Sequence, residues 1–190
     1  MKQPYLLVLF VFLHPILHGQ SKTDKPALHF INSIGMTDGS KGVGFLLQSV
    51  PGFSWRRSFA GIGIGIDDYN LRSVPLFLDL RQEFGRKSRH MFLYADGGYN
   101  FDWLTEKDGR EQQQFYSSNN FYGGIYCDAG IGYSIHLKSK DVFLISAGYT
   151  YKQLHDKVSY TVCTPGSCYL QPATITYRMP RLSVKAGWRF

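Results

Sequence analysis

The sequence predicts an all-β protein, an eight-stranded antiparallel up-and-down transmembrane β-barrel. The first observation is the end of the chain, residues 181–190, where apolar and polar side chains alternate strictly. Successive side chains of a strand point to opposite sides, so this strand has one wholly apolar face and one face with three positive charges. A wall that faces lipid around a polar lumen produces this pattern. The second observation is a mean hydropathy of only -0.20, with no stretch beyond the amino terminus near the roughly 20 apolar residues of a membrane helix.

The amino terminus predicts export. Lys2 precedes an apolar core at residues 5–13, which ends before Pro15, and this order is typical of a secretory signal peptide. The core is too short to span a membrane. We therefore expect a signal peptide at 1–19, a short periplasmic lead at 20–26 and an outer-membrane barrel at 27–190 as the one domain of the chain.

Alternation continues along the rest of the chain and predicts the strands in order. The expected strands cover residues 27–36, 43–50, 61–66, 73–84, 90–103, 119–135, 142–152 and the stretch that ends at 190. Short turns are expected near 56, 87 and 139, and longer loops near 39, 69, 110 and 163. The short turns of outer-membrane barrels face the periplasm, which places both termini on the periplasmic side.

Two stretches depart from the simple pattern. Gly-Ile-Gly-Ile-Gly at 61–65 has the composition of a phosphate-binding loop, but that motif requires a helix to follow, and another strand follows here. These glycines are instead expected to face the lumen, where they leave room for larger side chains. At 174–178 the polar face is out of phase with the strand after Pro180, which indicates either a bulge or a segment that rises clear of the membrane.

The formal net charge is +7. A basic chain can bind nucleic acid, but a group of its positive residues falls in the expected short turns, so no nucleic-acid partner is predicted. A basic rim would attract anionic phospholipid head groups by about 1 kcal/mol for each Lys or Arg near the surface; ordinary charging of solvated turns is the alternative. The residues of this group are Arg56, Arg57, Arg86, Lys87, Arg89, Lys138 and Lys140.

The cysteine spacing predicts one disulfide. Cys163 and Cys168 bracket a Pro-Gly turn, and this spacing can close a small loop in an oxidising compartment. The third cysteine, Cys127, falls on the apolar face of its strand and is expected to behave as a small hydrophobic residue.

The residues expected to face the lumen include as many acids as bases. The interior of an eight-stranded barrel is only wide enough to be filled by side chains, and a buried charge is costly unless it is paired and hydrogen-bonded. We therefore expect salt bridges that fill the lumen rather than an ion path. The expected members of this network are Asp79, Arg81, Glu83, Asp96, Asp128, Arg181, Lys185 and Arg189.

Two stretches carry a resemblance to a known family. Residues 72–81, Arg-Ser-Val-Pro-Leu-Phe-Leu-Asp-Leu-Arg, and 92–101, Phe-Leu-Tyr-Ala-Asp-Gly-Gly-Tyr-Asn-Phe, resemble the middle strands of small outer-membrane β-barrel proteins, the broadly OmpA- or OmpX-like porin-type barrels of diderm bacteria. The resemblance covers essentially the whole mature chain and implies a fold rather than an activity. Phe190 is similar to the aromatic end that the outer-membrane assembly machinery recognises, so this machinery is an expected partner. The chain departs from the family at Lys185, where a glycine is common.

Two other interpretations remain open from the sequence. Some eight-stranded outer-membrane barrels modify lipid A with Ser, His and an acid near the outer leaflet, and nothing in the spacing of such residues here brings them together. A secreted lipocalin-like barrel, which binds a small apolar ligand, would have the two faces reversed. Against this, the glycines share the charged face, which suits a crowded lumen better than a solvated surface. The candidates for the enzyme roles are Ser117, Ser118, His155 and Asp156.

The sequence thus predicts a monomeric outer-membrane barrel, exported by its signal and surrounded by outer-membrane lipids. Its function is expected to be structural or to lie in surface interactions, with the exposed loops as the binding surface for an extracellular partner. No catalytic residue and no cofactor is predicted. The six histidines are scattered without the spacing of metal ligands, so no metal site is predicted.

Overall fold

The computed structural model describes residues 25–85, 90–103, 119–137 and 141–190, apart from the side chains of residues 119, 120 and 160. The strands in these ranges are β1 (Ala27–Gly39), β2 (Gly42–Trp55), β3 (Ser58–Asp67), β4 (Ser73–Phe84), β5 (His90–Asp102), β6 (Asn119–Tyr122), β7 (Gly124–His136), β8 (Val142–Thr164) and β9 (Ser167–Arg189). The described part of the chain has no helix long and apolar enough to cross a membrane. The expected signal peptide at 1–19 lies outside the described residues, as does most of the lead at 20–26.

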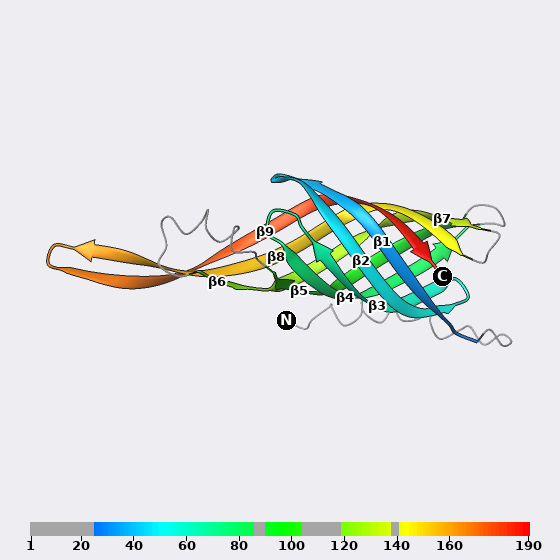
Figure 1. Cartoon of the computed structure of the whole chain (residues 1–190), viewed down its shortest axis with the longest axis horizontal. Helices are drawn as coiled ribbons and strands as arrows, with labels where there is room; N and C mark the ends of the chain where they lie inside the picture. The colour runs from blue at the N-terminus through cyan, green and yellow to red at the C-terminus, as the bar shows by residue number, and fades with distance from the viewer. Residues whose placement is uncertain (1–24, 86–89, 104–118, 138–140) are drawn as a thin grey trace, which may run out of the picture.

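The strands form one antiparallel sheet that closes on itself. They pair in the order β8, β7, β5, β4, β3, β2, β1 and β9, and β9 pairs again with β8. Figure 1 shows these strands tilted around a common axis as a barrel. The closure joins the two ends of the chain, because β1 and β9 pair from Ile31 with Arg189 to Gly39 with Arg181. The predicted antiparallel up-and-down barrel is therefore confirmed.

The ninth strand comes from a break in a stretch that the sequence predicts as a single strand. β6 and β7 both pair with β8, but Tyr122 lies opposite His155 while Tyr126 lies opposite Lys152. Four steps along one strand therefore match three steps along the other, which is the geometry of a β-bulge. Gly123 separates β6 from β7 at this bulge. The described chain thus has nine strands, and the ring itself contains eight of them.

Two of the predicted loops are in fact strands. The stretch predicted as a loop around residue 39 belongs to β1 and β2, which pair up to Gly39 with Gly42. The stretch around residue 163 belongs to β8 and β9, which pair up to Thr164 with Ser167. In both places polar residues and glycines suggest a loop, but the backbone ladder continues past them and only the tip is a turn.

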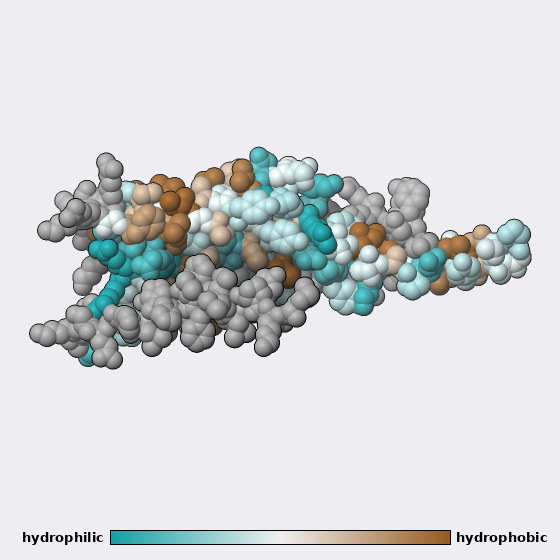
Figure 2. Space-filling view, turned by 180° about the vertical axis from the view of Figure 1, so that it is seen from behind, coloured by the Kyte–Doolittle hydropathy of each residue, from teal (hydrophilic) through white to brown (hydrophobic). Residues whose placement is uncertain are grey.

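The apolar face of the sheet is its outer face. Leu78 is 60% exposed and Trp188 41%, whereas Asp79 is 0% and Lys185 4% exposed. Figure 2 shows apolar residues gathered on the barrel wall. A lipocalin-like barrel would have the opposite arrangement, so that interpretation is wrong. We call this outer surface the apolar belt; it includes Ile62, Ile64, Leu76, Leu78, Leu80, Leu93, Ile125, Ile131, Ile145, Leu182 and Val184.

Large apolar side chains occupy the lumen between its charged residues. Phe77, Phe92 and Tyr126 are almost fully buried, and the rings of Phe77 and Tyr126 lie 5.4 Å apart between centroids. Gly63 lies opposite Phe77, and a Cβ atom at Gly63 would collide with the Phe77 ring. At this position a lumen-facing glycine leaves room for a larger side chain, as predicted.

β8 and β9 extend beyond the barrel as a hairpin, and β6 pairs with β8 at its base (Figure 1). Each strand has 23 residues, and their pairing keeps one register from Val142 with Arg189 to Thr164 with Ser167. The unbroken register rules out a bulge at 174–178, which was the first of the two predicted alternatives. The second alternative fits, because this stretch lies in the projecting part, residues 153–178, which we call the hairpin.

At the base of the hairpin the polar and apolar residues of β9 change faces, while the alternation of inward and outward side chains continues without a break. Within the barrel the buried face carries Arg181 and Lys185, and in the hairpin the same face carries Ile175 and Tyr177. The polar residues of the stretch 174–178 then face outward. A wall in water is expected to be polar and a wall in lipid apolar, so the exchange near Pro180 marks the edge of the apolar belt.

The tip of the hairpin carries the predicted disulfide. Cys163 and Cys168 pair directly across the two strands, with their Cα atoms 4.0 Å apart, and are joined by a disulfide bond. Cys127 lies exposed on the outer face of β7, where the sequence places a small hydrophobic residue.

Candidate functional site

Three groups of ionisable side chains lie along the lumen. From the hairpin toward the end that holds the carboxyl terminus, we call them the distal, central and proximal groups. They contain five acids and five bases, so their formal charges cancel. The distal group is Asp67, Lys152 and Arg181; the central group is Asp79, Arg81, Asp96, Asp128 and Lys185; the proximal group is Glu83 and Arg189.

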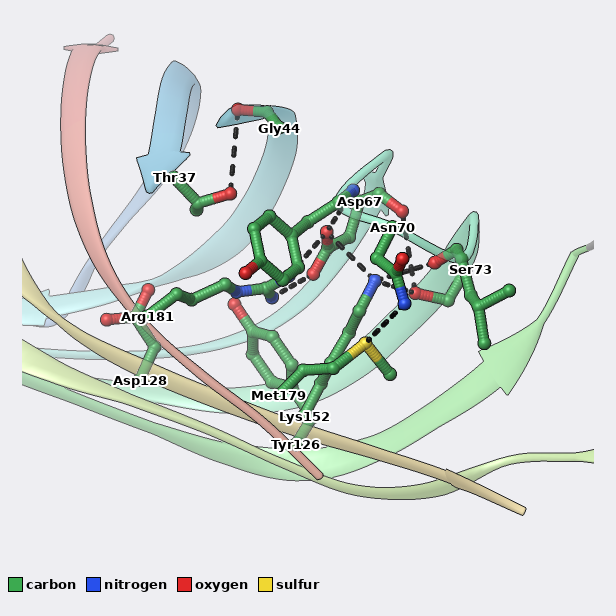
Figure 3. A network of polar contacts seen from close by, with 12 residues as sticks. Thr37, Gly44, Asp67, Asn70, Ser73, Tyr126, Asp128, Lys152, Met179 and Arg181 are labelled. Atoms are coloured by element: carbon green, nitrogen blue, oxygen red, sulfur yellow. Dashed lines mark hydrogen bonds and ion pairs between the residues drawn. The ribbon is translucent and has the colours of Figure 1, made fainter. Parts of the chain in front are cut away.

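Asp67, at the end of β3, is the centre of the distal group (Figure 3). Arg181 Nη1 donates to Asp67 Oδ1 at 2.9 Å, and Arg181 Nη2 donates to Oδ2. Lys152 Nζ donates to Asp67 Oδ1 at 3.2 Å, to the backbone oxygen of Leu71 at 2.7 Å and to Ser73 Oγ at 3.1 Å. The three charged side chains are 0% exposed. Their ion pairs therefore join β3 to β8 and β9 inside the lumen.

Tyr69 packs against the distal group from the turn that follows β3. Its ring centroid lies 5.0 Å from Arg181 Cζ, and its backbone N–H donates to Asp67 Oδ1 at 3.1 Å. The Tyr69 hydroxyl accepts a hydrogen bond of 2.9 Å from the backbone N–H of Lys41. A Cβ atom on Gly44 would lie 2.6 Å from Tyr69 Cα, so a glycine at position 44 permits this close approach.

Lys185 is the cation at the middle of the central group. Its Nζ donates to Asp128 Oδ2 at 2.9 Å and to Gln48 Oε1 at 3.4 Å, and it lies 4.2 Å from the centroid of the Tyr94 ring. The Tyr94 hydroxyl donates to Asp128 Oδ1 at 3.0 Å. Protein acceptors and an aromatic face thus replace the water that this ammonium group loses on burial.

Arg81 and Asp79 form the second ion pair of the central group. Arg81 Nε lies 3.0 Å from both Asp79 oxygens, and Nη2 lies 2.6 Å from Oδ2. The guanidinium carbon also lies 6.0 Å from the Phe59 ring centroid and 5.7 Å from that of Phe92. Arg81 is thereby fixed both by a carboxylate and by stacking contacts.

Asp96 has the weakest contacts of the central group. It pairs in register with Asp79 on one side and Asp128 on the other, so three carboxylates form a row across β4, β5 and β7. Among the described residues neither Asp96 oxygen makes a hydrogen bond, and Lys185 Nζ is 3.6 Å from Asp96 Oδ2. The central group therefore has one acid in excess and the distal group one base, and the two excess charges have opposite sign.

The proximal group is an ion pair at the end of the lumen that holds the carboxyl terminus. Arg189 Nη1 lies 2.9 Å from Glu83 Oε1, and the two side chains are 15% and 19% exposed. A cavity of about 160 Å³ lies beside them, with Arg56, Arg57 and Arg81 among its lining residues. Because this ion pair is partly solvated, its charges interact less strongly than those of the distal and central groups.

The eight residues predicted to line the lumen all lie on its inner face, but they do not pair only among themselves. Arg181 pairs with Asp67, which the sequence pattern assigns to a turn. Lys152, also in the distal group, is missed because it is the last residue of the predicted strand 142–152, where the assignment of faces ends. The signal was present in the alternation: Asp67 continues the face of Gly63 and Gly65. The pairs that the structure forms between predicted members are Arg81 with Asp79, Arg189 with Glu83, and Lys185 with Asp96 and Asp128.

The candidate residues for lipid A chemistry do not form a catalytic group in the described part of the chain. His155 and Asp156 are consecutive residues of β8, so their side chains point to opposite faces. Asp156 is 1% exposed, and burial raises the pKa of its carboxyl group. His155 Nδ1 instead lies 3.1 Å from Thr176 Oγ1 on the neighbouring strand. Ser117 and Ser118 lie outside the described residues.

The chemical character of the lumen is that of fixed ions that neutralise one another. A buried ion pair adds little net stability compared with apolar packing, but the loss of one partner costs about 3–5 kcal/mol because the other is left buried and unpaired. The pairs of Arg181 with Asp67 and of Lys185 with Asp128 join strands that are not neighbours in the ring. They therefore link parts of the wall across the lumen.

No protein-family model and no curated protein matches the chain. Among solved structures, the chain is similar to the outer membrane protein AlkL, determined by solid-state NMR in DMPC lipid bilayers, with 11% identity over 90% of this chain and 94% of that one and a TM-score of 0.47. It is also similar to the outer membrane protein OprG from Pseudomonas aeruginosa, with 12% identity over 87% of this chain and 97% of that one and a TM-score of 0.46.

Proposed function

We propose that the chain is an outer-membrane β-barrel protein with a sealed, charge-paired lumen, and that its hairpin serves interactions outside the cell. The observation that carries this proposal is the contrast between the apolar belt on the outside and the buried ion pairs inside. A contiguous apolar surface of this kind is rare on soluble monomers, and lipid is the solvent that matches it. A closed ring also gives the backbone of the wall its hydrogen-bond partners without an open edge.

The height of the belt supports a membrane location. On the last strand it covers the ten residues 181–190, from just after the exchange of faces at Pro180 to the chain end. At about 3.3 Å per residue and a tilt of about 40°, ten residues cover a height of about 25 Å, which is the height of the apolar band in outer-membrane barrels. The polar outer face of the hairpin then lies in water.

Two features of the hairpin support its proposed role in interactions outside the cell. Tyr169 and Leu170 are 53% and 62% exposed, although they lie outside the belt. β1 covers β9 only from Arg181 to Arg189, so among the described residues the outer edge of β9 beyond Arg181 has no strand beside it. An open strand edge with exposed apolar side chains is a surface on which a partner can add a strand.

The orientation of the hairpin can be tested on intact cells. A protease added from outside should cleave within residues 153–178 and leave the barrel in the membrane, since the hairpin would project from the cell. As a control, a variant in which a two-residue Asn-Gly turn replaces residues 159–172 should keep its folded, heat-shifted gel mobility and lose this cleavage. Cleavage that requires a permeabilised outer membrane would place the hairpin in the periplasm and refute the proposed orientation.

The sealed lumen can be tested separately by planar-bilayer recording. The purified protein should insert without a steady conductance, because ion pairs and aromatic side chains occupy the lumen at several levels. A general diffusion porin prepared in the same detergent serves as the positive control for insertion. A reproducible steady conductance from the folded protein would contradict the sealed lumen and leave the surface role of the hairpin untouched.

A further inference from the structure

We propose that Glu83, His90 and His136 form a binding site for a divalent transition-metal ion, with Zn²⁺ as the reference ion, at the proximal end of the lumen. One ligand atom from each residue, a carboxylate oxygen or an imidazole nitrogen, lies within 4.8 Å of the other two. This site goes beyond the proposed surface role and does not depend on it.

The register of the barrel brings these distant residues together. Glu83 on β4 lies opposite Phe92 on β5, and His90 stands two residues from Phe92 on the same inner face. His90 in turn lies opposite Ser134 on β7, and His136 stands two residues further on. Each step to the next strand therefore moves two residues toward the proximal end, and such diagonal neighbours on one face are within reach of long side chains.

The type of ligand selects the class of ion. Two imidazole nitrogens and one carboxylate oxygen are a ligand set that binds Zn²⁺, with water in the fourth position, whereas Mg²⁺ and Ca²⁺ prefer oxygen ligands only. Metal–ligand bonds of about 2.0–2.1 Å in a tetrahedron place ligand atoms about 3.3 Å apart. Binding would therefore draw the three ligand atoms, which now lie within 4.8 Å of one another, closer together by up to about 1.5 Å.

The two histidines are already packed for this role. Their ring centroids lie 4.3 Å apart at an interplanar angle of 53°. The two imidazole rings thus lie side by side at the end of the lumen, each with a ring nitrogen available as a ligand atom. His90 is half-buried and His136 exposed, which leaves a path for the ion from the proximal end.

Arg189 is the competitor of the metal for Glu83. Its Nη1 lies 2.9 Å from Glu83 Oε1, so the ion pair engages one oxygen of this carboxylate and adds a positive charge near the site. The nearby charge of Arg81 is offset by Asp79. A bound cation must therefore overcome the charge of Arg189, while Arg56 and Arg57 lie on the wall of the adjoining cavity. Removal of the Arg189 guanidinium group, which engages Glu83 directly, should strengthen metal binding.

The experiment is a calorimetric titration of Zn²⁺ into the full chain, folded in detergent micelles, freed of metal by a chelator and prepared without a polyhistidine tag. We expect one ion per chain in the wild type. His90→Ala and His136→Ala should each weaken binding by about tenfold or more, since each removes a ligand. His155→Ala, which alters a histidine in the hairpin, should bind as the wild type does.

Arg189→Met separates metal binding from a purely structural role of Glu83, His90 and His136, because the loss of a structural contact would not strengthen the binding of Zn²⁺. This variant should bind Zn²⁺ more tightly than the wild type, because Glu83 is released from its ion pair. Folding of each variant is verified by heat-dependent gel mobility, and Co²⁺ in place of Zn²⁺ reports histidine coordination through its visible absorption bands. The proposal is overturned if the wild type binds no ion, if both histidine variants bind as well as the wild type, or if Arg189→Met weakens binding.

Discussion

Asp67 is the residue on which the distal end of the lumen depends, because it is the carboxylate shared by Lys152 and Arg181. Asp67→Asn keeps the volume of the side chain and leaves two buried cations facing each other. We expect this variant to lower the free energy of unfolding by about 3–5 kcal/mol. Denaturant titration of the barrel in lipid vesicles, followed by tryptophan fluorescence, measures the change.

The neighbouring residue provides a matched control for Asp67→Asn. Asp68 also pairs with an arginine, Arg72, at 2.9 Å, but the side chain of Asp68 is 47% exposed and that of Arg72 38%. Asp68→Asn should therefore cost less than about 1 kcal/mol, as exposed ion pairs do. Equal costs for the two substitutions would show that burial does not decide the energetics of the distal group.

At the residue scale, the sequence identifies which side chains enter the lumen better than it identifies their partners. Alternation assigns Arg181 to the inner face, because that property depends only on residues next to it in the chain. Its partner, Asp67, is 114 positions away, and the pairing depends on the register of the ring. The same limit applies to Glu83, His90 and His136, whose spacing along the chain carries no sign of a metal site.

Beyond Val158 and Ala173, the tip of the hairpin pairs with no other strand among the described residues, so its stability depends little on the barrel. Its disulfide closes a loop with a sequence separation of 5, which stabilises a folded tip by about 2 kcal/mol. The double substitution Cys163→Ser and Cys168→Ser should leave heat-dependent gel mobility unchanged and make cleavage within residues 153–178 up to about thirtyfold faster. Limited proteolysis with and without reductant gives the comparison. A loss of the folded barrel band in the double variant would show instead that the tip supports the barrel.

The seam between β1 and β9 is the element that completes the ring. Phe30 and Phe190 exchange two backbone hydrogen bonds, of 3.0 and 3.1 Å, and their rings are stacked 5.9 Å apart. Phe190→Ala keeps the hydrogen bonds, so this variant should fold in micelles like the wild type. If the assembly machinery recognises the aromatic end, the same variant should accumulate less folded barrel in cells. Equal amounts of heat-shifted protein in outer membranes would argue against that recognition.

At the element scale, the sequence predicts strands well inside the belt and poorly beyond it. Within the belt the two environments differ most, so alternation is clear and the predicted 73–84 agrees with β4 at Ser73–Phe84. In the hairpin the apolar residues of β9 move to the inner face at Ile175 and Tyr177. Around residue 163 the side chains of both faces are largely exposed and Pro165 and Gly166 stand between the cysteines, which is why this stretch resembles a loop in the sequence although it is paired strand.

For the whole molecule, the fold follows from a single property that local patterns carry, the difference between the two faces of every strand. Closure, strand order and the short turns then follow from antiparallel pairing of neighbours. Local patterns do not contain the break at Gly123, where a bulge shifts the pairing with β8 by one residue between β6 and β7. They also omit the ion pairs across the lumen, which depend on the shear of the closed ring.

The proposal that lipid surrounds the barrel makes a prediction that a water-soluble barrel would not share. Leu78 lies in the apolar belt at 60% exposure, and Leu170 lies in the hairpin at 62% exposure. Leu78→Arg should lower the free energy of unfolding in a bilayer by about 2–4 kcal/mol, because a guanidinium group near the membrane centre loses its water. Leu170→Arg should change it by less than about 0.5 kcal/mol, as surface substitutions in water do. The two leucines are about equally exposed, so burial does not account for a difference between the two values, and a small cost at Leu78 would mean that the wall of the barrel faces water.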